Sequence, residues 1–235
     1  MTGHIFYNGG TGAATIIAEE ILRKNGIRFS PVLDASVTHL LLDTPVKVPL
    51  PEDLPKGITV IGGKVESDRC KCIDLLTDPL YLAENADITA HCAVKVALRH
   101  LPVTLKNCPV LVVGWGRIGK CLSSLLRAMG ARVTVAARKE SDRAMILALG
   151  YDALDAEKLS YELLRFRVIF NTVPVMLISK ETAGYCRPEC LKIELASLPG
   201  IEGTDVINAR GLPGKEAPET SGELIAKTVL RLTAP

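Results

Sequence analysis

The sequence lacks a long hydrophobic run. No stretch approaches the ~18 consecutive apolar residues of a membrane-spanning helix, so we expect no membrane partner. Residues 1–7 show no basic segment followed by an apolar one, and we therefore expect no secretion signal. Both expectations favour a cytoplasmic protein.

An excess of one charge is also missing, and aromatic residues are scarce. The 235 residues carry 28 Lys and Arg against 26 Asp and Glu, and aromatic residues make up 4%. Because no basic stripe with interleaved aromatic side chains is present, we expect no nucleic-acid partner. The hydrophobic fraction of 48% is typical of a globular protein with one large or two modest domains.

Cysteines form neither a disulfide framework nor a zinc motif. Their odd number, seven, and their scatter indicate a reducing compartment. Cys70-x-Cys72 and Cys186-x₃-Cys190 lack the spacing of a four-ligand zinc site, so we predict no metal.

What the chain does have is a dinucleotide-binding pattern around Pro109–Gly119. Val110–Val113 is a short apolar run rich in β-branched residues, typical of a buried parallel strand. A glycine turn with the spacing G-x-G-x-x-G follows, then a helix pattern over 120–129 and a second strand over 131–137. This order is that of a dinucleotide-binding unit.

The three glycines have separate expected tasks. Gly114 allows the tight turn, Gly116 lets a pyrophosphate approach the backbone, and Gly119 lets the helix pack on the strand. The alternative is a turn kept for packing in a domain that has lost its cofactor. The predicted pyrophosphate contacts are Gly114, Trp115, Gly116, Arg117, Ile118 and Gly119.

The end of the second strand favours NADP over NAD. NAD sites usually place a carboxylate there, but this chain has Ala137 followed by Arg138, whose guanidinium can pair with a 2′-phosphate. In the alternative, Arg138 stacks on adenine or faces solvent, and Glu140 binds the ribose. The predicted contacts are Ala137, Arg138, Lys139 and Ser141.

We predict an α/β fold: a Rossmann-type doubly wound parallel sheet with a second, smaller open α/β domain. Residues 1–88 form the small domain and 89–218 the nucleotide-binding domain; a helix over 219–233 is a candidate to pack on the first. The small domain has its own glycine turn, Gly9–Gly12, whose spacing favours a turn without ligand over a substrate-facing loop.

Further candidate ligand contacts follow the later strands of the predicted sheet. Strands are expected over 168–171, 191–197 and 205–209, and ligands of such folds bind beyond the carboxyl ends of the strands. The residues expected to line the ribose and nicotinamide are Asn171, Thr172, Val173, Pro174, Ala196 and Ser197.

Substrate and proton-transfer residues are expected on a bridging helix and on the segment 210–222. A helix capped by Thr89 would place His91 in its first turn, facing a cleft between the domains. Segment 210–222, rich in Gly, Pro and polar residues, predicts a long loop; its plainer interpretation is a structural turn. The candidates are Arg210, Thr220 and Ser221 for substrate binding and His91, Lys215 and Glu219 for catalysis.

Four segments together resemble the A subunit of dipicolinate synthase. They are Val-Val-Gly-Trp-Gly-Arg-Ile-Gly (112–119), Asn-Thr-Val-Pro (171–174), Glu-Leu-Ala-Ser-Leu-Pro-Gly (194–200) and Gly-Leu-Pro-Gly-Lys-Glu-Ala-Pro-Glu-Thr-Ser-Gly (211–222). The resemblance covers residues 85–233 and implies a two-domain protein that works with a flavoprotein B subunit. It also implies NAD(P)-linked dehydrogenation of a dihydrodipicolinate-type ring during sporulation.

The leading hypothesis is thus an NADP-dependent oxidoreductase acting on a small cyclic dicarboxylate, with a homo-oligomeric state expected. Two alternatives stay open. One is a non-catalytic subunit that binds NADP in a regulatory or structural role. The other is an enzyme like the 2-hydroxyacid dehydrogenases, acting on another small acid.

Overall fold

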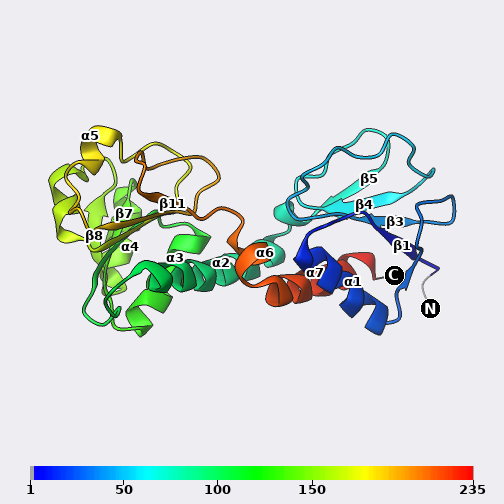
Figure 1. The fold of residues 1–235 in the computed structure, drawn as a ribbon, viewed down its shortest axis with the longest axis horizontal. Coiled ribbons are helices and arrows are strands. Elements are labelled where there is room, and N and C mark those ends of the chain that lie inside the picture. Colours follow the sequence, from blue (N-terminus) through cyan, green and yellow to red (C-terminus); the bar gives the residue numbers. More distant parts are fainter. Residues whose placement is uncertain (1–2, 235) are drawn as a thin grey trace. The chain divides into compact units, whose positions relative to one another are not determined.

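The computed structural model describes residues 3–234, which form two compact units (Figure 1). The five-stranded unit combines the chain up to Ile88 with the chain from Pro213 onward. The six-stranded unit runs from Thr89 to Leu212. Helix α2 (Pro79–His100) contains the first crossing between the units, and helix α6 (Leu212–Glu216) contains the second.

All strands of the five-stranded unit run parallel, in the order β2-β1-β3-β4-β5. Its elements are β1 (Ile5–Asn8), α1 (Ala13–Lys24), β2 (Arg28–Phe29), β3 (His39–Leu41), β4 (Thr59–Gly62), β5 (Lys71–Asp74), the 3₁₀ helix η1 (Leu75–Thr77) and α7 (Pro218–Thr233). Helix α1 packs on α7. A Cβ at Gly222 would lie 2.8 Å from the Ala14 carbonyl oxygen, so glycine lets the two helix backbones approach closely.

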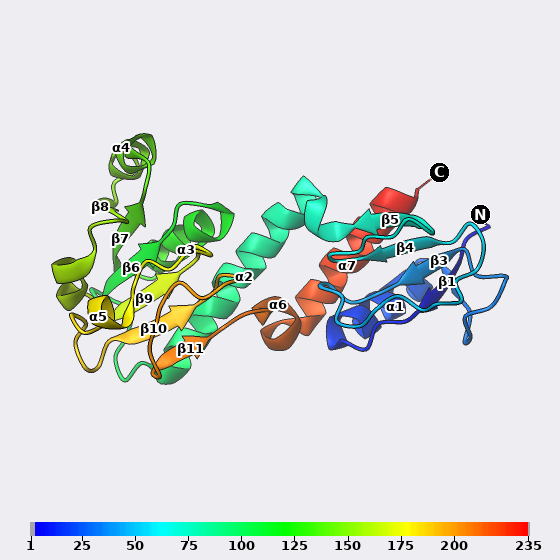
Figure 2. The same cartoon turned by 90° about the horizontal axis from the view of Figure 1, so that it is seen from above.

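The six-stranded sheet is also all parallel, in the order β11-β10-β9-β6-β7-β8 (Figure 2). Its strands are β6 (Pro109–Val113), β7 (Arg132–Ala137), β8 (Asp152–Asp155), β9 (Val168–Asn171), β10 (Leu191–Glu194) and β11 (Val206–Asn208). This is the strand order of the doubly wound dinucleotide-binding fold, with its switch point between β6 and β9. The predicted Rossmann-type α/β class is confirmed.

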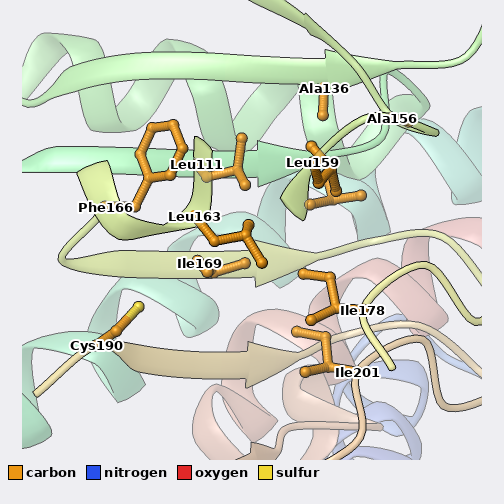
Figure 3. Packing of buried hydrophobic residues seen from close by; sticks show 11 residues of the cluster. Leu111, Ala136, Ala156, Leu159, Leu163, Phe166, Ile169, Ile178, Cys190 and Ile201 are labelled. Carbon is orange, nitrogen blue, oxygen red and sulfur yellow. The ribbon is translucent and has the colours of Figure 1, made fainter. Parts of the chain in front are cut away.

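Helices and loops cover the six-stranded sheet and close its core. They include α3 (Arg117–Ala128), α4 (Glu140–Ala148), η2 (Ser160–Arg165) and α5 (Lys180–Ala183). Leu111 on β6 and Ile169 on β9 pack with Leu163 and Phe166 in one buried cluster (Figure 3). Residues 110–113 are all fully buried, as expected of a parallel strand covered on both faces.

The bridging helix begins earlier than the sequence indicated. Helix α2 starts at Pro79, so Thr89 lies inside it and does not cap it, and His91 does not lie in the first turn. The cause is a start signal upstream: the Asp78 carboxylate accepts a hydrogen bond from the Tyr81 N–H at 2.7 Å, and Pro79 has the fixed φ suited to a first helical position.

The segment 210–222 is largely helical, which corrects the predicted long loop. Helix α6 occupies 212–216, and α7 begins at Pro218 rather than at Glu219. Proline is tolerated in a first helical turn because the N–H it lacks has no intrahelical partner there. No side chain caps α7, and Thr220 and Ser221 lie inside its first turn.

Short edge elements escaped the sequence prediction. Strands β5 and β8 mix polar and half-buried residues over four positions and show no apolar run. Helix α5 is also only four residues long. Strand β2 consists of Arg28 and Phe29 alone.

A buried histidine makes the stability of the five-stranded unit depend on pH. The His39 ring is 8% exposed and stacks on Phe6 with ring centroids 4.6 Å apart. Burial, followed by the charges of His4 and Lys71, lowers the pKa of His39 from 6.5 to about 4. The unfolded chain therefore binds the proton more readily than the folded chain between these two pKa values.

We predict that the unit loses stability as pH falls from 6.5 towards 4, because unfolding then takes up a proton. Between about pH 7 and about pH 5 the loss from this group should reach about 2 kcal/mol. Urea unfolding followed by circular dichroism measures it. His39→Phe should flatten this pH dependence, whereas His100→Gln, on an exposed helix end, should keep it; equal slopes in both variants would refute the assignment.

Candidate nucleotide-binding site

The turn between β6 and α3 requires glycine at two positions for reasons internal to the fold. Gly114 has φ of +109°, and a Cβ there would collide with the Thr172 hydroxyl and lie 2.7 Å from a methyl of Val173. A Cβ on Gly119 would collide with the Gly114 carbonyl oxygen. Both glycines are therefore explained by packing alone.

Gly116 differs from the other two glycines of the motif. Its φ of −77° and ψ of −171° are open to any residue, and a Cβ there would meet no atom within 4 Å. It occupies the N-cap of α3, and no side chain caps this helix. The first N–H groups of a helix have no intrahelical partner, and with positive charge at this end they suit an anion. Glycine suits an N-cap, but packing gives no reason for it here, whereas a ligand lying against the backbone would.

The turn after β9 is joined to this glycine turn. The Thr172 N–H and hydroxyl both donate to the Val113 carbonyl oxygen, each at 2.9 Å. The Gly114 N–H donates to the Ala136 carbonyl oxygen at 2.8 Å. The carboxyl ends of β6, β7 and β9 thus lie side by side at the switch point, where ligands of such folds bind.

A buried carboxylate holds the next loop. Glu194, at the end of β10, is 2% exposed. Its Oε1 accepts from the Ala196 N–H at 2.9 Å and from Asn171 Nδ2 at 2.8 Å. Its Oε2 accepts from the N–H groups of Gly200 at 2.7 Å and Ile201 at 3.2 Å. The sequence did not reveal this role of Glu194, since its partners lie in two separate segments.

The Asn171 side chain extends the same network. Its Nδ2 also donates to the Val173 carbonyl oxygen at 2.9 Å, and its Oδ1 accepts from the Val173 N–H at 3.1 Å. Gly200 fits against this turn so closely that a Cβ there would lie 2.9 Å from the Val173 carbonyl oxygen. Asn171 and Glu194 therefore position the turn 172–174 and the loop 195–201 relative to each other.

Around the end of β7, one arginine is anchored and another is exposed. Arg143 Nη1 donates to the carbonyl oxygens of Ala137 at 2.9 Å and Arg138 at 2.5 Å, and lies 3.7 Å from the Asp155 carboxylate. The Arg138 side chain is exposed. Asp155, in register with Ala137, is a carboxylate that the sequence prediction missed because β8 itself was missed.

The predicted cofactor residues come together at this one edge of the six-stranded sheet, with differing exposure. Exposed are Gly116, Arg117, Arg138, Lys139, Ser141, Pro174 and Ser197, and half-buried are Trp115, Ile118, Thr172 and Val173. Buried are Gly114, Gly119, Ala137, Asn171 and Ala196. The Trp115 ring meets the Tyr151 ring edge-on, with centroids 6.0 Å apart.

The predicted substrate and catalytic residues are divided between the two units. In the six-stranded unit, His91 is exposed on α2 and Arg210 is half-buried after β11. In the five-stranded unit, Lys215 on α6 and Glu219 and Thr220 on α7 are exposed, whereas Ser221 is buried. The cofactor candidates therefore all belong to one unit, whereas the substrate and catalytic candidates belong to both.

The second glycine turn, Gly9–Gly12, donates hydrogen bonds to a carboxylate side chain of the same protein. The Asp43 carboxylate accepts from the Gly12 N–H at 2.9 Å, the Thr11 N–H at 3.3 Å and the Thr15 hydroxyl at 2.7 Å. Burial acts to raise the pKa of Asp43, but these hydrogen bonds outweigh it and hold the pKa below 3.8. This geometry favours a turn without ligand.

Residues 3–234 lack two further classes of feature. No three His, Cys, Asp or Glu side chains of this range group closely enough to hold a metal ion. None of the helices described there combines the length and the apolar character needed to cross a bilayer.

We predict that two alanine substitutions in this turn affect different properties, one the stability of the fold and the other dinucleotide binding. Gly119→Ala should destabilise the fold by about 1–3 kcal/mol, because its Cβ would overlap the Gly114 carbonyl. Gly116→Ala should change stability by less than about 1 kcal/mol but weaken dinucleotide binding roughly ten-fold or more. Thermal unfolding and calorimetry measure the two effects. Unchanged binding in Gly116→Ala would leave this glycine without a ligand role.

The chain is similar in sequence to a curated protein, although no family model matches it. This relative is the A subunit of dipicolinate synthase from Bacillus subtilis (strain 168), and it is 29% identical over 158 residues. The match covers 64% of this chain and 53% of the relative, so it spans about half the length of that protein.

Solved structures share the fold over nearly the whole chain. The A subunit of dipicolinate synthase from Bacillus halodurans has a TM-score of 0.83 at 22% identity, covering 100% of this chain and 99% of that one. The A chain from Bacillus subtilis has 0.80 at 21%, covering 100% and 97%. A transhydrogenase from Sinorhizobium meliloti has 0.70 at 12%, covering 97% and 93%. The resemblance to the A subunit of dipicolinate synthase that the sequence indicated is confirmed, on a Rossmann-type fold that dehydrogenases share.

Proposed function

We propose that this protein is an NADP-dependent oxidoreductase of the dipicolinate synthase A type, which dehydrogenates a dihydrodipicolinate-type cyclic dicarboxylate. Gly116 is the observation that carries the proposal. It is a glycine that packing does not require, at the uncapped start of α3 and beside the switch point of the sheet. The curated relative, whose name states a dipicolinate synthase, supports the substrate class.

The residues present fit a dinucleotide. The first-turn N–H groups of α3 would hold the pyrophosphate. The turn 172–174 and the residues Ala196 and Ser197, fixed by Asn171 and Glu194, would flank the ribose and the nicotinamide. When bound, NADP⁺ supplies the acceptor for a hydride from the substrate ring. The chain contributes orientation and a group that takes the proton.

The proposed preference for NADP depends on which arginine side chains near the end of β7 can bind a 2′-phosphate. Arg143 is anchored to two carbonyl oxygens and faces Asp155, so it is committed to the local structure. Arg138 is exposed at the end of β7, where NAD sites place a carboxylate and this chain has Ala137. Its guanidinium can form paired hydrogen bonds to a 2′-phosphate, with Lys139 and Ser141 beside it. The competing arrangement uses Glu140 for the ribose of NAD.

A dicarboxylate substrate needs positive charge and hydrogen-bond donors. Arg210, Thr220 and Ser221 are proposed to bind it, and His91, Lys215 and Glu219 are proposed for proton transfer, with His91 first because histidine is the side chain that most often serves as a general acid or base. A flavoprotein B subunit is the proposed partner, and sporulation is the proposed setting.

A non-catalytic NADP-binding subunit is the second candidate. It is favoured by the Gly9–Gly12 turn of the five-stranded unit, whose N–H donors Asp43 already occupies, so that this turn offers no donors to a substrate. An enzyme like the 2-hydroxyacid dehydrogenases, acting on another small acid, uses the same nucleotide site and differs only in substrate.

We predict that Arg138→Ala weakens NADP⁺ binding by about 1.5–3 kcal/mol and leaves NAD⁺ binding unchanged, because only NADP⁺ has the 2′-phosphate that Arg138 would hold. Isothermal titration calorimetry measures both affinities. Arg132→Ala is the matched control, since Arg132 lies exposed at the other end of the same strand and should affect neither cofactor. Wild-type preference for NAD⁺ would instead assign the ribose contact to Glu140.

Turnover separates the enzyme from the non-catalytic subunit. We expect the full chain, with or without a candidate B subunit, to reduce NADP⁺ when given a dihydrodipicolinate-type ring, as seen by nicotinamide absorbance. His91→Gln should then lower kcat by roughly 10²-fold or more, as expected for loss of a general base. Tight NADP⁺ binding with no turnover under either condition would favour the non-catalytic subunit.

A further inference from the structure

The turn between β7 and α4 is only two residues long. Strand β7 ends at Ala137 and helix α4 begins at Glu140, so Arg138 and Lys139 alone connect them. The direction of a side chain is set by the two peptide groups that meet at its Cα. For Arg138 these groups carry the carbonyl oxygens of Ala137 and of Arg138 itself. Any contact that fixes both oxygens therefore fixes the direction in which the Arg138 side chain leaves the backbone.

One guanidinium holds both carbonyl oxygens. Arg143 Nη1 donates to the Ala137 oxygen at 2.9 Å and to the Arg138 oxygen at 2.5 Å. The backbone of Arg143 belongs to α4, where its N–H donates to the Lys139 carbonyl oxygen at 3.1 Å. Its side chain is 23% exposed, so most of it is packed against the chain. The turn is therefore anchored from a helix, and little ordering of it remains to be done when a ligand binds.

A carboxylate lies beside the same guanidinium, at the end of the neighbouring strand. Asp155, the last residue of β8, is in register with Ala137. Its Oδ1 accepts a hydrogen bond from the Glu157 N–H at 3.1 Å, so its own loop holds the carboxylate in place. The same oxygen lies 3.7 Å from Arg143 Nη1, which is too long for a hydrogen bond but close enough for attraction between the charges. Without Arg143, this negative charge would keep its position and lose its partner.

Arg143 also sets the balance of charge at this corner of the sheet. The other charged side chains of the turn, of the start of α4 and of the end of β8 are Arg138, Lys139, Glu140, Asp142 and Asp155. With Arg143 the cations equal the carboxylates in number, and without it the carboxylates are in excess. A 2′-phosphate carries roughly two negative charges near neutral pH, whereas NAD⁺ has a neutral hydroxyl there. An excess of carboxylates therefore disfavours NADP⁺ much more than NAD⁺.

We propose that Arg143 is a positioning residue that determines the choice of cofactor. It acts through Arg138, whose backbone it fixes, and through Asp155, whose charge it neutralises, and it needs no contact with the cofactor itself. This inference rests on the proposed function, because it presupposes a 2′-phosphate beside Arg138. The discrimination against NAD⁺ then depends on two arginines, one that binds the phosphate and one that prepares the turn for it.

Arg127 provides a matched control at the opposite end of α4. Its Nη1 also donates to a backbone carbonyl oxygen, that of Leu149, at 2.7 Å. Leu149 follows the last turn of α4, and Tyr151, whose ring centroid lies 4.1 Å from Arg127 Cζ, precedes β8. These contacts therefore lie at the amino edge of the sheet, away from the carboxyl end of β7. A substitution of Arg127 removes the same kind of hydrogen bond without touching the turn 138–139.

The test measures the binding of NADP⁺ and NAD⁺ to the full-length chain by isothermal titration calorimetry. Arg143→Gln should weaken NADP⁺ binding roughly ten-fold or more and change NAD⁺ binding by less than about three-fold, because only NADP⁺ depends on the direction of Arg138 and on the local charge. Arg127→Gln should leave the ratio of the two affinities unchanged, and thermal unfolding checks that both variants are folded. Equal losses for both cofactors in Arg143→Gln would make Arg143 a purely structural residue and overturn the proposal.

A double variant tests the part played by Asp155. In Arg143→Gln with Asp155→Asn the unpaired charge is gone, while the side-chain oxygen at 155 can still accept from the Glu157 N–H. NADP⁺ binding should therefore recover about three-fold or more relative to Arg143→Gln alone. Asp155→Asn by itself should not weaken NADP⁺ binding. An affinity of the double variant no higher than that of Arg143→Gln would refute the action of Arg143 through this charge.

The wild type alone decides the proposed function. Preference for NAD⁺, or no binding of either cofactor, would refute the proposed NADP site and this inference with it. Preference for NADP⁺ in the wild type together with an unchanged affinity ratio in Arg143→Gln would refute this inference and leave the proposed function standing.

Discussion

The carboxyl edge of the six-stranded sheet depends on one buried carboxylate. Glu194 accepts hydrogen bonds from backbone N–H groups of its own loop and from the side chain of Asn171 on the neighbouring strand. Burying a charge without partners is costly, and each hydrogen bond to a charged group contributes roughly 1.5–3 kcal/mol. Removing the carboxylate would leave several buried donors unpaired at once. The turn 172–174 and the loop 195–201, proposed to face the ribose and the nicotinamide, are therefore held in place by the hydrogen bonds that stabilise the buried charge of Glu194.

In both units a carboxylate accepts hydrogen bonds from backbone N–H groups, but the two carboxylates have different structural roles. In the five-stranded unit, the Asp43 carboxylate reaches the glycine turn after β1 and satisfies its N–H groups from within the chain. In the six-stranded unit, the acid at the strand end ties loops together, and the turn at the start of α3 has no side-chain cap. One turn is thus completed by the protein itself, and the other is the proposed anion site.

Local patterns in the sequence predicted the centre of the fold. The β-branched run 110–113 and the glycine spacing after it identify β6 and α3 because both signals lie within a dozen consecutive residues. Asp78 and Pro79 carried an equally local start signal for α2, but Thr89 also suits a helix start and was preferred wrongly. Pro213 and Pro218 were interpreted as loop residues, although each lies in a first helical turn, where proline is allowed. The contacts of Glu194 with Asn171 and of Asp43 with Thr15 could not be predicted, because they join segments distant in sequence that only the strand order brings together.

The strands at the borders of the two sheets are short or charged. β2 has two residues and β11 has three, while β5 carries Lys71 and Asp74 and β8 begins and ends with aspartate. An exposed strand edge is a template on which another chain can extend the sheet, and brief, charged edges suppress this pairing. If copies of this protein associate, they will therefore do so through helices or loops, and the open borders of its parallel sheets are protected against the fibrous aggregation that longer apolar edges invite.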